Sequence, residues 1–406
     1  MREGSKGRWL IDELDIMMNM DKISPKFQAI FVTGSQKVVG YEVFPYYRDE
    51  GQEYELTSFL NNRTIPEEYR LEVDQHVRRI AFKELSALAP GKAIYVTIRP
   101  ELYTGTIGDS LVEELETLKN QVVLGILLTD EFTSWADHKH FTYYLQMSGL
   151  RVSMKHTSIK EIAMSDIVHV KPDIIEIDMN DIEDDVANVQ RELLHVYSIA
   201  ASKIGASLLF QGVESFQQLT DAWKHGARFV QGNFLAMKKE STANNQSYQA
   251  DLVKHFRSFV SFEQNRIQRL LDFTVYLDRR VSSVLEEEKT RSYDDLALTI
   301  GKRLEDVCFR VYIVNNDGEQ QSANAVQSDQ AWKLDEANRW QNWSWRPYFL
   351  ENIIRMNVDG KGVLSVLYKD LTSNDHIRTF SYPITTSEYV FIDIAYHYLF
   401  DHDYVH

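Results

Sequence analysis

The feature that most constrains the fold is a repeated alternation of short apolar segments with longer amphipathic ones between residues 28 and 236. Strands that alternate with helices of this length form parallel sheets. Seven or eight such units in about 240 residues predict an α/β barrel or a doubly wound sheet. The strand-like segments are QAIFV with VVGYEVF, then AIYVTI, VVLGILLT, LRVSMKH, DIIEID, SLLFQGVE and RFVQGNFL.

Polar residues fall at the carboxyl ends of these strands, where a barrel carries its ligand site. They are Thr97, Lys155, His156, Glu176, Gln211 and Gln231. Glu42 is different, because it lies inside the apolar run VVGYEVF. A carboxylate in such a strand costs several kcal/mol unless a metal or a cation compensates it.

The rest of the chain divides in two. Residues 241–249 are polar, and residues 250–288 contain no Pro or Gly and carry apolar residues at steps of three and four. This seam indicates a helix that either packs on its own domain or pairs across a dimer. We predict a barrel domain over 1–245, a connector helix over 246–290 and a smaller α+β domain over 291–406.

Composition limits the function. The net charge of −16 argues against nucleic-acid binding through bulk charge and against a polybasic membrane patch. The N-terminal segment lacks the apolar core of a signal peptide, and no run reaches the ~18 apolar residues of a membrane span. A single cysteine, Cys308, excludes a disulfide framework and fits a reducing compartment, so we expect a cytoplasmic protein without membrane insertion.

Four motifs carry a resemblance to a known family: KVVGYEVF, PDIIEID, LLFQGVES and ARFVQGNFL. In order and spacing they resemble the EAL family of cyclic-di-GMP phosphodiesterases, over nearly all of residues 15–236. The segments KVVGYEV, WSWRPYFLEN and RTFSYP resemble the YkuI type within that family. The resemblance implies a modified (β/α)8 TIM-like barrel, a helical connector and a PAS- or Cache-like sensor domain.

The resemblance also implies a site for two divalent cations, Mg²⁺ or Mn²⁺, that activate water. At seven positions where it implies metal ligands or a catalytic lysine, this chain keeps only the glutamate of the signature. The seven are Glu42, Thr97, Leu127, Lys155, His156, Glu176 and Gln211. Asp130, Glu214 and Gln231 remain from the neighbouring motif positions.

Lys155 places an ammonium where the resemblance implies a metal-bridging carboxylate. A cation within ~4 Å of a divalent ion is repelled by several kcal/mol, so we expect no catalytic residue and no bound metal. Our hypothesis is that Lys155 replaces the metal as the counter-charge of Glu42 and Glu176. Alternatives are solvated rim charges, a zinc site of Glu42, His156 and Glu176, or metal-free acid–base chemistry by Lys155 and His156.

Ligand binding demands less than hydrolysis. Tyr46 stands where the resemblance implies a ligand-binding arginine, although Arg48 and Arg99 are nearby cations. Because two acidic rim residues without metals repel a dianion, we expect cyclic-di-GMP binding to be doubtful.

The C-terminal domain has a loose amino-acid-sensor pattern. Arginine can fork a carboxylate and aspartate can take an ammonium. The residues in this order are Arg346, Tyr348, Phe349, Tyr368 and Asp393. The alternative is an aromatic core without a ligand.

Together these features predict a catalytically inactive signalling or interaction module related to cyclic-di-GMP, homodimeric, with a possible protein partner. The alternative is a receptor that binds cyclic-di-GMP, or a small molecule in the C-terminal domain, without hydrolysis; an active phosphodiesterase is the third reading.

Overall fold

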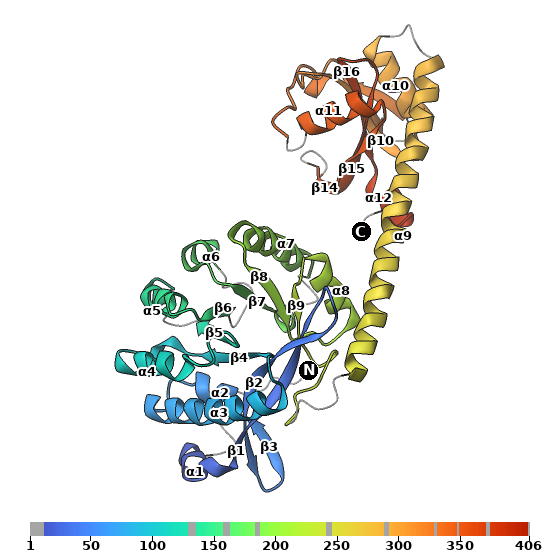
Figure 1. The fold of residues 1–406 in the computed structure, drawn as a ribbon. Coiled ribbons are helices and arrows are strands. Elements are labelled where there is room, and N and C mark those ends of the chain that lie inside the picture. Colours follow the sequence, from blue (N-terminus) through green and yellow to red (C-terminus); the bar gives the residue numbers. More distant parts are fainter. Residues whose placement is uncertain are drawn as a thin grey trace. The chain divides into compact units, whose positions relative to one another are not determined.

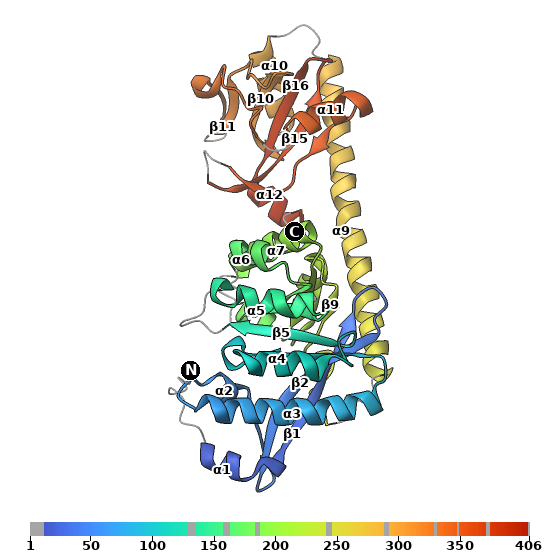
Figure 2. The same ribbon diagram turned by 60° about the vertical axis from the view of Figure 1, so that its left-hand side comes forward.

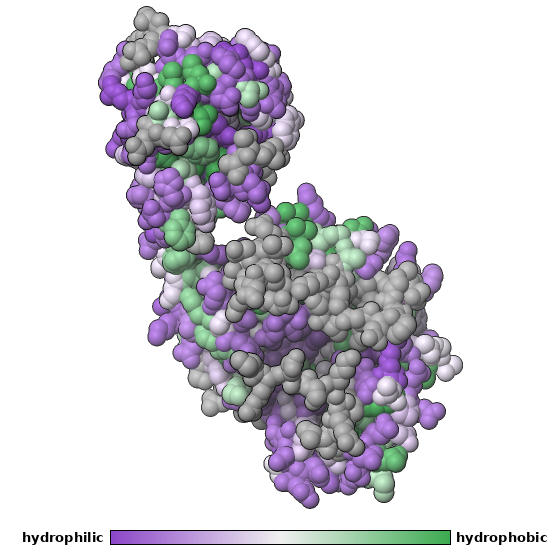
Figure 3. All heavy atoms as spheres, turned by 180° about the vertical axis from the view of Figure 1, so that it is seen from behind, coloured by the Kyte–Doolittle hydropathy of each residue, from purple (hydrophilic) through white to green (hydrophobic). Residues whose placement is uncertain are grey.

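The computed structural model contains two compact units, Met1–Arg257 and Ser258–His406. It describes residues 12–128, 135–156, 163–182, 187–240, 246–287, 292–328, 331–346, 349–370 and 374–404. Within these ranges, no helix is both long and apolar enough to cross a membrane. Figure 3 shows that hydrophilic side chains dominate the coloured surface of one face, in keeping with the net charge.

The first unit is a closed eight-stranded barrel, which confirms the predicted barrel. Its strands are β1 (Ile23–Val32), β2 (Val38–Asp49), β4 (Ala93–Ile98), β5 (Val122–Leu128), β6 (Arg151–His156), β7 (Ile174–Asp178), β8 (Ser207–Gln211) and β9 (Phe229–Val230). The order is β1-β9-β8-β7-β6-β5-β4-β2, and β1 also pairs with β2, which closes the ring. β1 is antiparallel to both neighbours, whereas β2 and β4 to β9 run parallel. The short β3 (Gln52–Glu55) extends β2 outside the ring.

Helices surround this barrel (Figures 1 and 2). They are α1 (Glu13–Met18), α2 (Thr57–Asn61), α3 (Glu67–Leu88), α4 (Thr106–Leu115), α5 (Trp135–Met147), α6 (Met164–Val170), α7 (Ala187–Ile204) and α8 (Phe216–Lys224). Their ends follow local chemistry. Ser215 caps α8 by accepting from the Gln218 amide, and Gly205, directly after α7, has a φ of 78° that favours glycine.

An apolar layer inside the barrel fixes where the polar residues lie. Ile30, Tyr95, Val123, Ile174 and Leu209 form one buried cluster. Side chains two residues apart on a strand point to the same face. Two positions further along the strands, towards the carboxyl ends of the parallel strands, lie Gln28, Thr97, Gly125, Glu176 and Gln211. A mainly polar layer therefore lies directly above the apolar layer, at the end of the barrel that we call its mouth.

The long helix α9 (Gln246–Glu287) follows the barrel along the chain. In the first unit, its Phe256 contacts Trp223 edge to face, with ring centroids 5.2 Å apart. In the second unit, Leu277, Val281 and Val284 lie in the hydrophobic core. This part of the predicted seam therefore packs on its own domain.

The second unit is an α+β domain with an antiparallel sheet, as predicted. Its main sheet has the order β12-β11-β10-β16-β15-β13. The strands are β10 (Cys308–Asn315), β11 (Asn324–Ser328), β12 (Ala331–Asp335), β13 (Val363–Leu364), β14 (Tyr368–Lys369), β15 (His376–Pro383) and β16 (Glu388–Ile394). The helices are α10 (Tyr293–Arg303), α11 (Phe349–Asp359) and α12 (Tyr396–Asp401).

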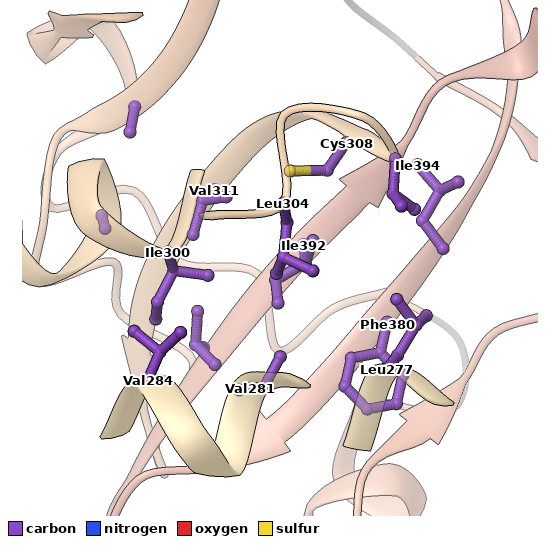
Figure 4. Packing of buried hydrophobic residues seen from close by; sticks show 14 of the residues in the cluster. Leu277, Val281, Val284, Ile300, Leu304, Cys308, Val311, Phe380, Ile392 and Ile394 are labelled. Atoms are coloured by element: carbon purple, nitrogen blue, oxygen red, sulfur yellow. The ribbon is translucent and has the colours of Figure 1, made fainter. Parts of the chain in front are cut away.

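Residues of α9, α10 and the sheet form the core of this unit (Figure 4). Cys308 lies in that core at 1% exposure, and burial raises the pKa of its thiol above the usual value. Its position is that of a small hydrophobic residue.

Candidate functional site

Glu42 lies inside the barrel, on the stretch of β2 that faces β1. Its carboxylate is 4% exposed and accepts hydrogen bonds from Lys155 Nζ at 2.5 Å and from Gln231 Nε2 at 2.8 Å. Gln28, opposite Glu42 in the β1–β2 register, accepts a further bond from Gln231 Nε2 at 3.2 Å. The buried carboxylate is therefore compensated by a lysine and a glutamine.

Lys155 also faces Glu176. Its Nζ lies 3.4 Å from Glu176 Oε2, and the Ser153 hydroxyl donates to Oε1 of the same carboxylate. Gly125 leaves room for this contact, because a Cβ at that position would lie 3.3 Å from both Glu176 Oε1 and Ser153 Oγ. The structure thus brings Lys155, Glu42 and Glu176 together; we call these three residues the barrel cluster.

Electrostatics follow from this geometry. Burial disfavours the charged form of Lys155, but Glu42 and Glu176 outweigh it, so the pKa of the ammonium lies above its usual value. For Glu176, burial is the largest effect, and Lys155 offsets only part of it, so its pKa is raised. Oε2 of Glu176 has no hydrogen-bond partner among the described residues. This one oxygen is therefore compensated by the charge of Lys155 and not by a hydrogen bond.

The other predicted residues are less central. Thr97 Oγ1 lies 3.5 Å from Glu42 Oε1, and Leu127 and Gln211 are buried. Glu214 is exposed, and its amide donates to Gln218 Oε1 at 2.7 Å. His156 ends β6, but its side chain lies outside the described part of the chain, as does all of Asp130.

The side chains present do not fit the two-cation site that the resemblance implied. Both carboxylates of the barrel cluster already contact Lys155, and Thr97, Leu127 and Gln211 add no anionic oxygen. In the described ranges, no group of three His, Cys, Asp or Glu residues is placed to hold a metal ion. The proposed zinc alternative depends on His156 and stays untested.

A small cavity of about 70 Å³ opens beside the barrel cluster. β2, α2, α3 and β4 contribute to its wall, which includes Glu42, Phe44, Thr97, Arg99 and Lys155. Arg99, which the sequence marked as a candidate cation, is 3% exposed. Arg48, the other candidate, has a side chain 54% exposed and pairs with Glu53 and Glu240.

In the C-terminal candidate site, Asp393 is paired with Arg310, a residue that the sequence pattern did not include. Asp393 is fully buried and accepts from Arg310 Nε at 2.6 Å and from Thr379 Oγ1 at 2.6 Å. Arg310 also donates to Asp370 Oδ1 at 2.8 Å. One signal for this cluster is present in the sequence, because the charged Arg310 lies inside the apolar strand FRVYIV.

Three of the remaining residues of that pattern, Arg346, Phe349 and Tyr368, lie in the described part of the chain. The Tyr368 hydroxyl contacts Thr379 Oγ1 at 2.6 Å, and the Arg346 guanidinium lies 4.2 Å from the Trp343 ring centre. Phe349 is buried and stacks on Phe391, and Tyr348 lies outside the described residues. Because Arg310 occupies Asp393, this carboxylate is not open to an incoming ammonium group.

Family comparisons cover almost the whole chain. Residues 11–238 match the EAL domain, and residues 242–406 match the YkuI_C domain, an EAL-domain associated signalling protein domain. The uncharacterized EAL-domain containing protein YkuI of Bacillus subtilis (strain 168) is 32% identical over 407 residues, which cover 97% of this chain and 99% of the relative.

One solved structure is similar over the same length. It is the crystal structure of the Bacillus subtilis YkuI protein, with an EAL domain, in complex with substrate c-di-GMP and calcium. The identity is 30%, the TM-score is 0.89, and the match covers 96% of this chain and 99% of that chain.

This complex contradicts the doubt about cyclic-di-GMP binding, so that expectation was wrong. The charge argument counted Glu42 and Glu176 as two uncompensated anions. In the structure, the Lys155 ammonium contacts both carboxylates. The repulsion that a dianionic ligand would meet is correspondingly smaller.

Proposed function

Because this chain belongs to the EAL-domain family and also carries a YkuI_C domain, we propose that its barrel is a cyclic-di-GMP receptor that binds the dinucleotide without hydrolysing it. The receptor role draws support from the complex of the related YkuI protein. The loss of hydrolysis is inferred from the side chains of the barrel cluster.

The observation that carries the proposal is the position of Lys155 Nζ, 2.5 Å from Glu42 and 3.4 Å from Glu176. A divalent cation would need these same carboxylate oxygens as ligands. An ammonium between them repels that cation and occupies its ligands. Without the metal, no water is activated for attack on phosphorus.

Binding itself needs a shaped, partly polar mouth, which the barrel retains. Gln231 is 1% exposed, and its Oε1 has no hydrogen-bond partner among the described residues. Gly232, next to it, has a φ of 157°, and a Cβ there would lie 2.1 Å from the Val213 carbonyl oxygen. This close approach of the backbone at residue 232 to that of Val213 therefore requires glycine.

Calorimetric titration of the full chain with cyclic-di-GMP, with and without Mg²⁺ or Mn²⁺, tests both halves of the proposal. We expect saturable binding that the metals leave unchanged, and chromatography of the mixture should show no linear dinucleotide. Heats equal to dilution would refute the receptor. Linear product in the presence of a metal would refute the loss of hydrolysis.

A further inference from the structure

Arg99 is a buried arginine at the wall of the small cavity. It follows β4 directly, is 3% exposed and lines the same space as Glu42, Thr97 and Lys155. A buried guanidinium is costly unless its charge and its five N–H donors are satisfied. Its partners therefore indicate whether it serves structure or a ligand.

The partners of Arg99 are incomplete. Its Nε donates to Asn61 Oδ1 at 2.7 Å, and its nearest carboxylate oxygen is Asp74 Oδ1, 3.8 Å from Nη1. Among the described residues, its two terminal nitrogens make no hydrogen bond. Burial lowers the pKa of Arg99 despite Asp74, as expected for a cation with little compensation.

Arg78, on the same cavity wall, shows what a satisfied arginine looks like here. It donates to Asp74 at 2.8 Å, to the Tyr103 hydroxyl at 2.6 Å and to Glu114 Oε2 at 2.9 Å. Tyr103 also donates to Asp74 Oδ2. Both of these bonds to Asp74 use Oδ2. Asp74 Oδ1 faces Arg99 but lies 3.8 Å from Nη1, beyond hydrogen-bond distance, so the terminal nitrogens of Arg99 keep unused donors at the cavity wall.

We propose that Arg99 binds a phosphate group of the ligand, with its terminal nitrogens donating to the phosphate oxygens in this cavity. The guanidinium fork matches phosphate geometry. A volume of about 70 Å³ is roughly that of two water molecules, which is enough for one phosphoryl group. The wall also carries the cations Arg78 and Lys155 and the carboxylates of Glu42 and Asp74, so its formal net charge is positive.

This inference rests on the proposed receptor function and names a residue for it. The decisive variant is Arg99→Gln, and the matched control is Arg48→Gln, which removes the same charge from an exposed, ion-paired arginine of the same unit. By calorimetry on the full chain, we expect cyclic-di-GMP affinity to fall roughly 10- to 100-fold in Arg99→Gln. We expect less than about a twofold change in Arg48→Gln, as for a screened surface charge.

The outcomes separate the inference from the function. If the wild type binds and Arg99→Gln binds within twofold of it, the inference is wrong and the receptor stands. If the wild type does not bind, inorganic phosphate is the probe, added at matched ionic strength against sodium chloride. A phosphate-induced rise in melting temperature that Arg99→Gln loses would keep the phosphate site; equal shifts in both proteins, or none, would overturn it.

Folding of the variant must be checked, because Arg99 is buried. Circular dichroism and melting temperature report this directly. If Arg99→Gln does not fold, Arg99→Lys decides, since it keeps the charge and loses the fork. We expect it to bind cyclic-di-GMP several-fold more weakly than the wild type; unchanged affinity would contradict the proposal.

Discussion

The two units each bury one cation between two carboxylates, but they do so differently. In the barrel cluster, Lys155 is 13% exposed and makes one short bond and one contact of 3.4 Å. In the C-terminal unit, Arg310 binds Asp393 through Nε at 2.6 Å and Asp370 through Nη2 at 2.8 Å. We call Arg310, Asp370 and Asp393 the sheet cluster.

The difference is whether the cation satisfies both carboxylates completely. The arginine fork fixes both of its carboxylates, and neither Asp370 nor Asp393 is more than 2% exposed. The lysine is a point charge at a cavity wall and leaves Glu176 Oε2 without a hydrogen bond among the described residues. We infer that the sheet cluster serves stability and that the barrel cluster serves ligand binding.

The largest effect is expected from breaking the sheet cluster. Arg310→Met leaves two buried carboxylates without their cation, which should lower the free energy of unfolding by about 3–5 kcal/mol. Urea unfolding followed by tryptophan fluorescence measures this loss. Four of the seven tryptophans, Trp332, Trp340, Trp343 and Trp345, belong to this unit.

A surface ion pair of the same unit provides the control. Arg303 pairs with Glu287 at 2.8 Å, and both side chains are more than half exposed. Arg303→Met should change the free energy of unfolding by less than about 1 kcal/mol. Similar losses in the two variants would mean that Arg310 has no special structural role.

The second largest effect is expected in the barrel cluster, where the stability changes at Lys155 and Glu176 should depend on each other. Lys155→Ala leaves Glu42 and Glu176 facing each other and should cost about 2–3 kcal/mol, less than Arg310→Met because the mouth is partly open. Adding Glu176→Gln removes one of the two charges, so the double variant should be more stable than Lys155→Ala alone. Urea unfolding followed by circular dichroism gives both values, and additive losses would count against the pairing.

The sequence predicted the secondary-structure elements and the fold better than the side-chain contacts between residues far apart in the chain. Strand and helix periodicity predicted an α/β barrel or a doubly wound sheet, and the resemblance to the EAL family selected the barrel. Glu42 was conspicuous as a charge in an apolar run. Arg310 is the same kind of signal in FRVYIV, yet its partner Asp370 is 60 residues away and is brought close only by the fold. Gly125 and Ser153 matter because the β5–β6 register pairs them, which no local pattern reveals.

The smallest expected effect is a pH-dependent change in the stability of the barrel cluster. The pKa of Glu176 is raised in the folded protein from its usual 4.5, so the folded state binds its proton more tightly than the unfolded chain. Ionised Glu176 therefore costs stability, and the cost grows as pH rises from about 4.5 through the folded pKa. Glu176→Gln removes this cost, so its stability relative to the wild type should increase from pH 4 to pH 7, measured by urea unfolding. A difference that is constant or that shrinks over this range would show that Lys155 fully compensates Glu176, and the barrel cluster would then be as closed as the sheet cluster.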